Sequence, residues 1–566
     1  MKPNGDRPRL KRQRGSAKGF VLTGVVAIIS YLTLLPLLYL LWGTFIDEGG
    51  ITLRHFEAAY TSVPLGELVR NSAIFSIGST VVATTVGTLL AFLLTRTNVP
   101  FKGIGFILSL VPLLIPGLLT SVAWVLLLSP RTGAINVMIE PIVGPEFFNI
   151  FSIAGMIFVE GLDLTPLAFL LMVAAFRGMD PALEESAMVS GASLWTVVRR
   201  VTLPLVLPGL YAATLILVVR SLESFETPAV LGIPNGNWVF TSRIWDVLRF
   251  PPDYGQAGAL ALSLIFVTIL GVYLYSRLSK RARSFQTVTG RGYRPAVMDL
   301  GRKRWLGASF IAIYALIAVV GPMIIIIYMS TQPFYTTPSL EGLSRISWDA
   351  FEEVIGNSLF TRALTNSLLL GIAAATVVMF LTAIGSWLVV RTRLRGRWLL
   401  DSLTFIPITI PGIVLGVSLL FMYLRNPLPI YGSLWILLIA YCTKYLPYGM
   451  RYSSGSMFQV STDLEESAMV SGASWWTSMR RIVLPLLKPG LLAGWMYVVL
   501  VAVRELSSSI LVYSPGSEVL SVIMWQHWEH GQLPELAALG LIMIAIMTVI
   551  LVIARSLGAK VGVREG

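Results

Sequence analysis

A polar stretch occurs twice in a chain that is otherwise rich in apolar segments. Residues 184–209 read EESAMVSGASLWTVVRRVTLPLVLPG and residues 465–490 read EESAMVSGASWWTSMRRIVLPLLKPG, with the first ten positions identical. An amphipathic helix at the membrane interface would not require ten identical residues. Binding to one shared partner surface would require them. We therefore interpret the two copies as equivalent docking loops, and we assign no catalytic residue to the chain.

Both copies have the sequence pattern of a helix, a turn and a second helix. Acidic residues stand in the first turn of the first helix, where the helix dipole favours negative charge. Gly191 and Gly472 are expected to end that helix, and the second helix is expected to begin near Ser193 and Ser474. Each copy should thus form an elbow that lies across one face of the membrane.

Ionisable residues within or beside the apolar segments form a second candidate site, on the translocation path. Asp163 is related to Lys444, and Glu223 to Arg504, by the same shift of 281 residues that relates the two loops. Charges at such depth are costly and are usually paired or face water. We hypothesise that each couple of opposite charges meets across the axis between the halves and helps to close the path. The alternative is that each charge finds a partner or water within its own half.

Two further acids, Glu226 and Glu505, stand close to these positions in the sequence. A path for cations would favour acids there, whereas external helix ends in the headgroup region could also carry them. The segment from Trp525 to His530 contains two histidines and a glutamate, which could bind a metal. Tryptophan and histidine at that height more often form an interfacial belt, so we assign no metal site.

The composition places the chain in a membrane. Of its 566 residues, 55% are hydrophobic and only 13% are charged, and its mean hydropathy is +0.75. That charge is too little to cover a soluble surface of this size. The single cysteine, Cys442, lies in an apolar segment, which excludes an intramolecular disulfide and a metal site built from cysteines.

The net charge of +13 arises mainly in two segments. Lysine and arginine are concentrated in the N-terminal segment 1–19 and in a central linker, residues 278–305. Basic clusters beside apolar spans mark cytoplasmic segments. Neither cluster has the interleaved aromatic residues of a nucleic-acid-binding surface, so the expected surroundings are a lipid bilayer and no nucleic acid.

The apolar segments predict an all-α polytopic membrane protein with about twelve transmembrane helices, arranged as two parallel six-helix repeats. The halves are residues 20–277 and 306–566. Because each half starts and ends on the same side, both chain termini are expected in the cytoplasm, and the halves should be related by a pseudo-two-fold axis along the membrane normal. Pro-Gly steps at Pro116 and Pro411 should kink their helices, either for function or merely for packing.

The repeated loops resemble the EAA loop of binding-protein-dependent ABC importer permeases, which reads E-A-A, three residues, G, nine residues and I-x-L-P. Ser186 and Val201 in the first copy and Ser467 in the second are mild departures. The matching positions are Glu185, Ala187, Gly191, Leu203 and Pro204 in the first copy, and Glu466, Ala468, Gly472, Ile482, Leu484 and Pro485 in the second.

The resemblance implies that each loop forms a coupling helix seated in a cleft of a separate ATPase subunit. The chain contains no G-x-x-x-x-G-K-[ST] phosphate loop, so ATP is expected on that partner and no cofactor on this chain. Two nearly identical loops imply two identical clefts and hence a homodimeric ATPase. The expected coupling residues are Glu184, Glu185, Ala187, Gly191, Glu465, Glu466, Ala468 and Gly472.

A permease with both six-helix halves in one chain most resembles the ferric-iron type of importer of the bacterial inner membrane, to which a periplasmic binding protein delivers the cargo. Thiamine, or another small solute such as a phosphonate or a polyamine, is the alternative substrate. An ion-gradient-driven secondary transporter also uses parallel repeats, but it would not need two matched elbows. The chain is expected to be a transport permease and not an enzyme.

Overall fold

The computed structural model describes residues 15–47, 50–61, 63–180, 182–279, 297–392, 395–424 and 429–556. Most of the predicted basic N-terminus and most of the predicted linker lie outside the described residues. The described part is almost entirely helical, as predicted. Its two strands, β1 (Ile46–Asp47) and β2 (Gly50–Ile51), form one short antiparallel pair after the first helix.

The first half consists of long membrane helices joined by shorter ones. The longest, of 32 residues, exceeds the length needed to cross a hydrocarbon layer of about 30 Å. In order, its helices are α1 (Gly15–Phe45), α2 (Arg54–Thr61), α3 (Leu65–Arg96), α4 (Lys102–Leu110), η2 (Val111–Leu114), α5 (Gly117–Leu128), α6 (Ala134–Val143), α7 (Ile153–Arg177), α8 (Ala182–Val189), α9 (Leu194–Val197), α10 (Leu203–Glu223), α11 (Phe240–Val247) and α12 (Tyr254–Ser279).

The second half repeats this order, so that α3, α7, α8 and α10 correspond to α17, α20, α21 and α23. Its helices are α13 (Arg304–Ala315), α14 (Gly321–Ser330), α15 (Leu340–Ser344), α16 (Asp349–Gly356), α17 (Ser358–Arg391), α18 (Arg397–Phe405), η9 (Ile406–Thr409), α19 (Gly412–Leu424), α20 (Leu434–Gln459), α21 (Thr462–Val470), α22 (Trp475–Ser478), α23 (Leu484–Val503), α24 (Ser509–Val512), α25 (Leu520–Glu529) and α26 (Leu533–Ser556).

Nine helices within the described residues are long and apolar enough to cross a membrane, and eleven spans result if each of two bent helix pairs counts as one. The counterpart of α7 in the second half, α20, is not among them, although it has 26 residues. Lys444, Arg451 and several tyrosines make it more polar than its neighbours. The polytopic all-α fold is confirmed, whereas the predicted count of twelve spans is not.

The prediction that the Pro-Gly steps break their helices is confirmed. The chain turns by 100° between α4 with η2 and the following α5, and by 107° between α18 with η9 and the following α19. Pro116 and Pro411 stand at the two corners. Proline supplies no N–H for the helical hydrogen bond, so the helix cannot continue through it unchanged.

Small residues allow the long helices to pack closely. Where α3 crosses α7, a Cβ atom added to Gly87 would lie 2.6 Å from the Cβ atom of Ala168. At the equivalent crossing of α17 and α20, a Cβ atom added to Gly449 would lie 2.9 Å from the Oγ1 atom of Thr382. Gly87 corresponds to Thr382, and Ala168 to Gly449. The glycine has thus changed helices between the halves, while the close approach is retained.

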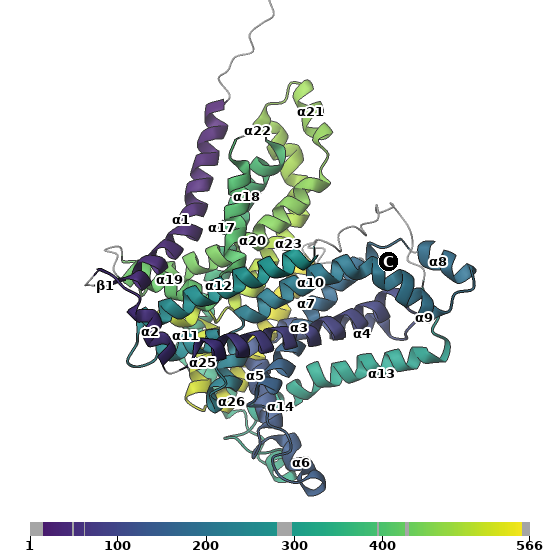
Figure 1. The fold of residues 1–566 in the computed structure, drawn as a ribbon, viewed down its shortest axis with the longest axis vertical. Helices are drawn as coiled ribbons and strands as arrows, with labels where there is room; N and C mark the ends of the chain where they lie inside the picture. The colour runs from purple at the N-terminus through teal and green to yellow at the C-terminus, as the bar shows by residue number, and fades with distance from the viewer. Residues whose placement is uncertain are drawn as a thin grey trace, which may run out of the picture.

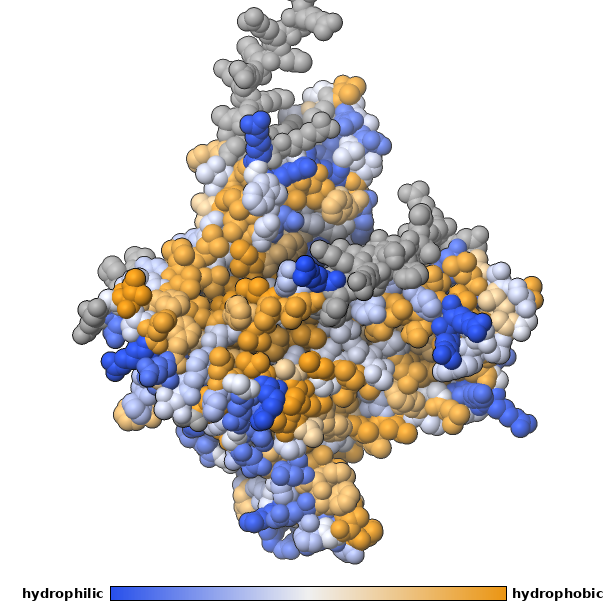
Figure 2. Space-filling model, in the orientation of Figure 1, coloured by the Kyte–Doolittle hydropathy of each residue, from blue (hydrophilic) through white to orange (hydrophobic). Residues whose placement is uncertain are grey.

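The first helix of each half packs against the other half (Figure 1). Helix α1 lies against α18, α19 and α20, where the hydroxyl of Thr443 donates to the carbonyl of Leu32 at 3.1 Å. In return, α13 lies beside α4 and α14 beside α5. Figure 2 shows hydrophobic side chains over the middle of one face and hydrophilic ones toward its ends. That distribution is typical of a protein whose waist is surrounded by lipid.

Candidate functional site

The two candidate docking loops have the predicted form. Helix α8 ends at Val189 and α21 at Val470, and the chain then turns through Gly191 and Gly472, whose φ angles are +84° and +87°. Glycine adopts this left-handed conformation without strain, which explains the residue type at both positions. The prediction that these glycines end the first helix is confirmed.

The second helix of each loop begins where predicted. Ser193 and Ser474 accept hydrogen bonds from the backbone N–H groups of Thr196 and Thr477, at 3.3 and 3.2 Å. Each serine therefore caps its helix, α9 or α22. The chain then passes through one π-helical turn that carries the paired arginines and leads into α10 or α23.

A buried ion pair anchors the first loop to a membrane helix. Arg96 is the last residue of α3, and its Nη1 atom lies 3.6 Å from Oε2 of Glu184 on α8, with both side chains only 1% exposed. Arg96 also donates to the carbonyl of Met179 at 3.2 Å, and Thr202 donates to Oε1 of Glu184 at 2.6 Å. Because loss of either charge would leave the other buried without compensation, the pair fixes the loop to α3.

The second loop repeats the anchor with one difference. Arg391, at the end of α17, lies 3.3 Å from Glu465 on α21. Val483 stands at the position of Thr202 and cannot donate to the glutamate. The side chain of Glu465 is accordingly 15% exposed, against 1% for Glu184. The second loop is therefore held less tightly than the first.

The predicted coupling residues divide into two groups. Glu184 and Glu465 are turned inward as the anchors. Arg96 and Arg391, their partners, are not among the residues predicted from the sequence, although a signal exists, because both end a long apolar segment and are related by the repeat. The remaining six predicted residues are exposed or half-buried on the outer side of the loops: Glu185, Ala187, Gly191, Glu466, Ala468 and Gly472.

Each loop also presents apolar side chains at its outer surface. Leu183 and Leu464 are both 46% exposed, and Val189 and Val470 are both 89% exposed. The two loops therefore present the same apolar side chains to the same extent.

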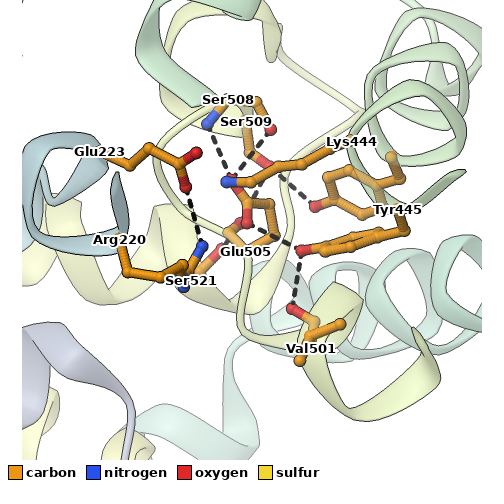
Figure 3. A network of polar contacts seen from close by, with 10 residues as sticks. Arg220, Glu223, Lys444, Tyr445, Val501, Glu505, Ser508, Ser509 and Ser521 are labelled. Carbon is orange, nitrogen blue, oxygen red and sulfur yellow. Dashed lines mark hydrogen bonds and ion pairs between the residues drawn. The ribbon is translucent and has the colours of Figure 1, made fainter. Parts of the chain in front are cut away.

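The second candidate site is a cluster of charged groups between the two halves (Figure 3). Its best-coordinated member is Glu505, which follows α23. Its Oε1 atom accepts from Nζ of Lys444 at 2.6 Å and from both the N–H and the hydroxyl of Ser508 at 3.0 Å. Its Oε2 atom accepts from the hydroxyl of Tyr445 at 2.8 Å. Four donors therefore stabilise a single carboxylate.

The hypothesis that equivalent opposite charges pair across the axis is not supported. Lys444 pairs with Glu505 at 2.6 Å, and Glu223 pairs with Arg220 at 2.9 Å. Both charges thus find their partners within their own half, which is the alternative stated above. The reason is proximity, because Arg220 stands one helical turn before Glu223.

The halves nevertheless meet through these charges. Arg504 donates to the carbonyl of Leu113, next to the Pro-Gly corner of the first half, at 2.8 Å. Arg504 also interacts electrostatically with Asp163, and Lys444 interacts with Glu223. The shift of 281 residues relates Asp163 to Lys444 and Glu223 to Arg504, so the two interactions are equivalent under the repeat. The cluster therefore retains pseudo-two-fold symmetry.

Three acids of the first half, unlike Glu223, have no cationic side chain of the described residues in contact with them. Glu160, which sequence reasoning missed, accepts from the hydroxyl of Ser224 at 2.7 Å. Within the described part of the chain, Glu160, Asp163 and Glu226 form no ion pair. Glu160 is 4% exposed, and Glu226 is half-buried. The first half thus adds three carboxyl groups to the cluster without a direct counter-ion.

Both Pro-Gly corners reach this cluster. A Cβ atom added to Gly412 would lie 2.6 Å from Nζ of Lys444 and 3.2 Å from Oε1 of Glu505. In the first half, a Cβ atom added to Gly117 would lie 3.9 Å from the carboxyl carbon of Glu226. Any side chain at Gly412 would displace the ion pair. The broken helices therefore bring bare backbone against the charged groups.

The histidine-containing segment lines a pocket. Trp525 is buried against Phe225 and Trp245, with ring centroids 5.3 and 5.7 Å apart, so the interpretation of this tryptophan as part of an interfacial belt is wrong. His527 and His530 line a pocket of about 200 Å³ beside α16 and α26. No group of three or more His, Cys, Asp or Glu side chains among the described residues is placed to hold a metal ion.

Comparison with known proteins gives a family and several relatives. The family model described as "Binding-protein-dependent transport system inner membrane component" matches residues 83–284 and 368–562. The putative ferric transport system permease protein FbpB 1 of Haemophilus influenzae is 25% identical over 513 residues, which cover 88% of this chain and 78% of the relative.

Two further relatives differ in how much of the chain they match. The Fe(3+)-transport system permease protein FbpB 2 of Haemophilus influenzae is 24% identical over 91% of this chain and 93% of its own length. The putative 2-aminoethylphosphonate transport system permease protein PhnV of Salmonella typhimurium is 29% identical over 35% of this chain and 76% of its own length.

Proposed function

The chain belongs to the family of inner membrane components of binding-protein-dependent transport systems, and from this premise we propose that it is the permease of an ATP-driven importer of ferric iron. The assignment of iron as the substrate rests on the similarity to ferric permeases, which extends over both halves and 88–91% of this chain. Similarity to the 2-aminoethylphosphonate permease extends over 35% of it, which makes a phosphonate the second candidate.

The iron is delivered by a periplasmic binding protein, because transport systems of this family depend on one. The permease releases the ion on the side of the two docking loops. Segments rich in lysine and arginine mark the cytoplasmic side of a membrane protein. The docking loops and both chain termini are therefore assigned to the cytoplasm, and the chain crosses the inner membrane several times.

ATP hydrolysis takes place on a separate ATPase that binds both docking loops. Three observations support identical binding clefts: the ten identical residues, the matching φ angles of Gly191 and Gly472, and the equal exposure of the apolar side chains. Identical clefts are supplied most simply by an ATPase homodimer. Movement of its subunits would reach α3 and α17 through the buried arginine–glutamate anchors.

The test is uptake by proteoliposomes that contain the permease and its ATPase, supplied with the cognate periplasmic binding protein. We expect radiolabelled ferric iron to accumulate only when both ATP and the binding protein are present. Accumulation of 2-aminoethylphosphonate in place of iron would contradict the assignment of ferric iron as the substrate. Iron uptake driven by an ion gradient without ATP would contradict the mechanism. Co-purification of two different ATPase subunits would contradict the homodimer.

A further inference from the structure

Five tyrosines form a continuous row in the second half. Four of them stand on α20 at spacings of four, three and four residues, which places them on one face of the helix. The fifth, from α23, lies between the last two. The ring centroids of successive members are 6.3, 6.3, 5.4 and 5.7 Å apart. In spatial order the row is Tyr441, Tyr445, Tyr448, Tyr497 and Tyr452.

The row leads from the charge cluster toward the second docking loop. Tyr441 and Tyr445 are only 1% and 3% exposed, whereas Tyr452 is 37% exposed. The helix between Tyr441 and Tyr452 is roughly 16 Å long at about 1.5 Å per residue. Because α20 ends shortly before α21, the exposed end of the row faces the side of the docking loops.

Helix packing does not require these hydroxyl groups. The equivalent positions of the first half hold one acid and four aliphatic side chains, and the corresponding helices pack closely there without a phenol. Each hydroxyl buried in a membrane protein needs a hydrogen-bond partner and is otherwise costly. The second half therefore carries a polar route that its packing does not explain. The first-half residues are Glu160, Leu164, Leu167, Ile216 and Leu171.

The buried end of the row contacts the best-coordinated acid of the cluster. Tyr445 donates to Glu505 at 2.8 Å (Figure 3). The hydroxyl of Tyr441 lies 2.7 Å from that of Ser509. Carboxylate and phenol oxygens are hard ligands that suit multivalent cations. In this structure the ammonium group of Lys444 occupies the cation position beside Glu505.

The surrounding groups also favour a cation. The residue Tyr314 is 4% exposed, and its buried hydroxyl has no hydrogen-bond partner among the described residues. Such an unsatisfied group is costly unless a further ligand completes it. Carboxyl groups outnumber cationic groups in the cluster by five to three: Glu160, Asp163, Glu223, Glu226 and Glu505 against Arg220, Lys444 and Arg504.

We propose that Glu505, Tyr445 and Tyr441 form a transient binding station for the multivalent cation that is transported. Lys444 is the resident counter-ion, and the arriving cation displaces it. The other tyrosines offer successive oxygen ligands toward the side of the docking loops. No electron is transferred, and each phenol that binds as phenolate releases one proton to solvent. This inference rests on the proposed function, since it assigns a place to the iron.

The test is binding of ferric nitrilotriacetate to the full-length permease, with its ATPase, in lipid nanodiscs. Phenolate bound to ferric iron absorbs visible light by charge transfer, so the band should grow as iron is added. Tyr445→Phe and Tyr441→Phe each remove one oxygen, and each should lose most of the band and bind iron about 10–100-fold more weakly. Tyr273→Phe is the matched control, because Tyr273 is 52% exposed on α12. Its band should equal that of the wild type.

A second variant tests the role of the resident ammonium. Lys444→Met should bind iron more tightly than the wild type, since no internal cation competes. Unchanged affinity would overturn the role of Lys444. A wild-type complex without the band, or Tyr445→Phe with unchanged band and affinity, would overturn the station.

Uptake by the same preparations separates the station from the proposed function. Iron uptake by a wild-type complex that shows no band overturns the station and leaves the proposed function intact. Uptake of another solute in place of iron overturns the proposed function itself.

Discussion

Arg96 and Glu184 form an ion pair, at 3.6 Å and with 1% exposure of both side chains, that joins the end of α3 to the first docking loop. The pair recurs between Arg391 and Glu465 at 3.3 Å, where the glutamate is 15% exposed. A buried charge pair resists separation, so displacement of a loop should displace the membrane helix attached to it. The two loops are nearly identical in sequence but unequal in how firmly they are held.

Replacement of Arg96 by methionine should destabilise the protein strongly. It leaves Glu184 buried without its counter-charge, which costs about 3–5 kcal/mol. Arg391→Met should cost less, because Glu465 reaches solvent more readily. The thermal unfolding midpoints of the purified variants measure this difference.

A matched variant isolates the hydrogen bond that the second loop lacks. Thr202→Val gives the first loop the residue type of the second, and loss of a hydrogen bond to a charged group costs about 1.5–3 kcal/mol. Equal losses for Arg96→Met and Arg391→Met, together with no effect of Thr202→Val, would show that the two anchors do not differ.

Features that depend on local chemistry could be predicted from the sequence. Gly191 and Gly472 end their helices because the conformation after a helix favours glycine in any protein. Pro116 and Pro411 stand at the breaks because a proline favours extended backbone in the residue before it, and Ile115 and Ile410 are extended. The sequence repeat showed which elements of the two halves correspond. Hydropathy was weaker evidence that α20 spans the membrane, because Lys444 makes this helix less apolar although it packs like its counterpart α7.

The pairing of charges could not be predicted, because a repeat gives equivalent positions and no distances. Lys444 pairs with Glu505, whose counterpart in the first half is Ser224, so symmetry alone could not suggest the contact. The pair of Arg220 with Glu223 could have been predicted from the sequence, since residues three apart lie on one face of a helix.

Leucine at Gly191 or Gly472 should uncouple ATP hydrolysis from iron uptake. An added Cβ atom would meet no heavy atom within 4 Å at either position, so the fold has room for the side chain. The left-handed backbone would be strained by about 1–2 kcal/mol, and the outer surface of the loop would change. Iron transported per ATP hydrolysed should fall about tenfold, which corresponds to about 1.4 kcal/mol.

Asparagine at the same positions is the control for this prediction, because it tolerates the left-handed conformation better than leucine does. It should retain most of the coupling. Leucine variants with the wild-type ratio of iron to ATP would argue against a coupling role for the loops.

Acid should release the end of the linker from the segment that follows α3. Asp299 accepts hydrogen bonds from the backbone N–H of Gly301 at 2.8 Å and from the side chain of Asn98 at 2.5 Å, and these bonds hold the pKa of its carboxyl below the ordinary value. A lowered pKa in the folded state means that the stabilisation is complete above the ordinary pKa of about 3.9. It is lost as the pH falls through the folded-state pKa.

Limited proteolysis by an acid-stable protease, as a function of pH, measures this release. Cleavage next to Asp299 should accelerate in acid for the wild type, relative to Asp299→Asn, whose side chain does not titrate in this range. Parallel pH profiles for the two proteins would mean that Asp299 does not control the attachment.

The ion pair of Lys444 with Glu505 should appear as a coupling energy in a double-mutant cycle. Lys444→Met leaves a buried carboxylate without its cation and should lower the free energy of unfolding by about 3–5 kcal/mol, and Glu505→Gln should also be destabilising. The double variant removes both charges and should be more stable than the sum of the single losses predicts, by about 0.5–3 kcal/mol. Thermal unfolding followed by circular dichroism provides the four values.

Exchange of Asp163 with Lys444 serves as the control for this cycle. These residues occupy equivalent positions in the two halves, but Lys444 is paired with Glu505, so Asp163→Lys combined with Lys444→Asp should recover no stability. The exchange would place a second carboxylate beside Glu505, and like charges at such a distance repel. Strictly additive losses in the cycle would mean that Lys444 and Glu505 do not stabilise each other. Recovery of stability by the exchange would mean that Lys444 interacts mainly with the opposite half.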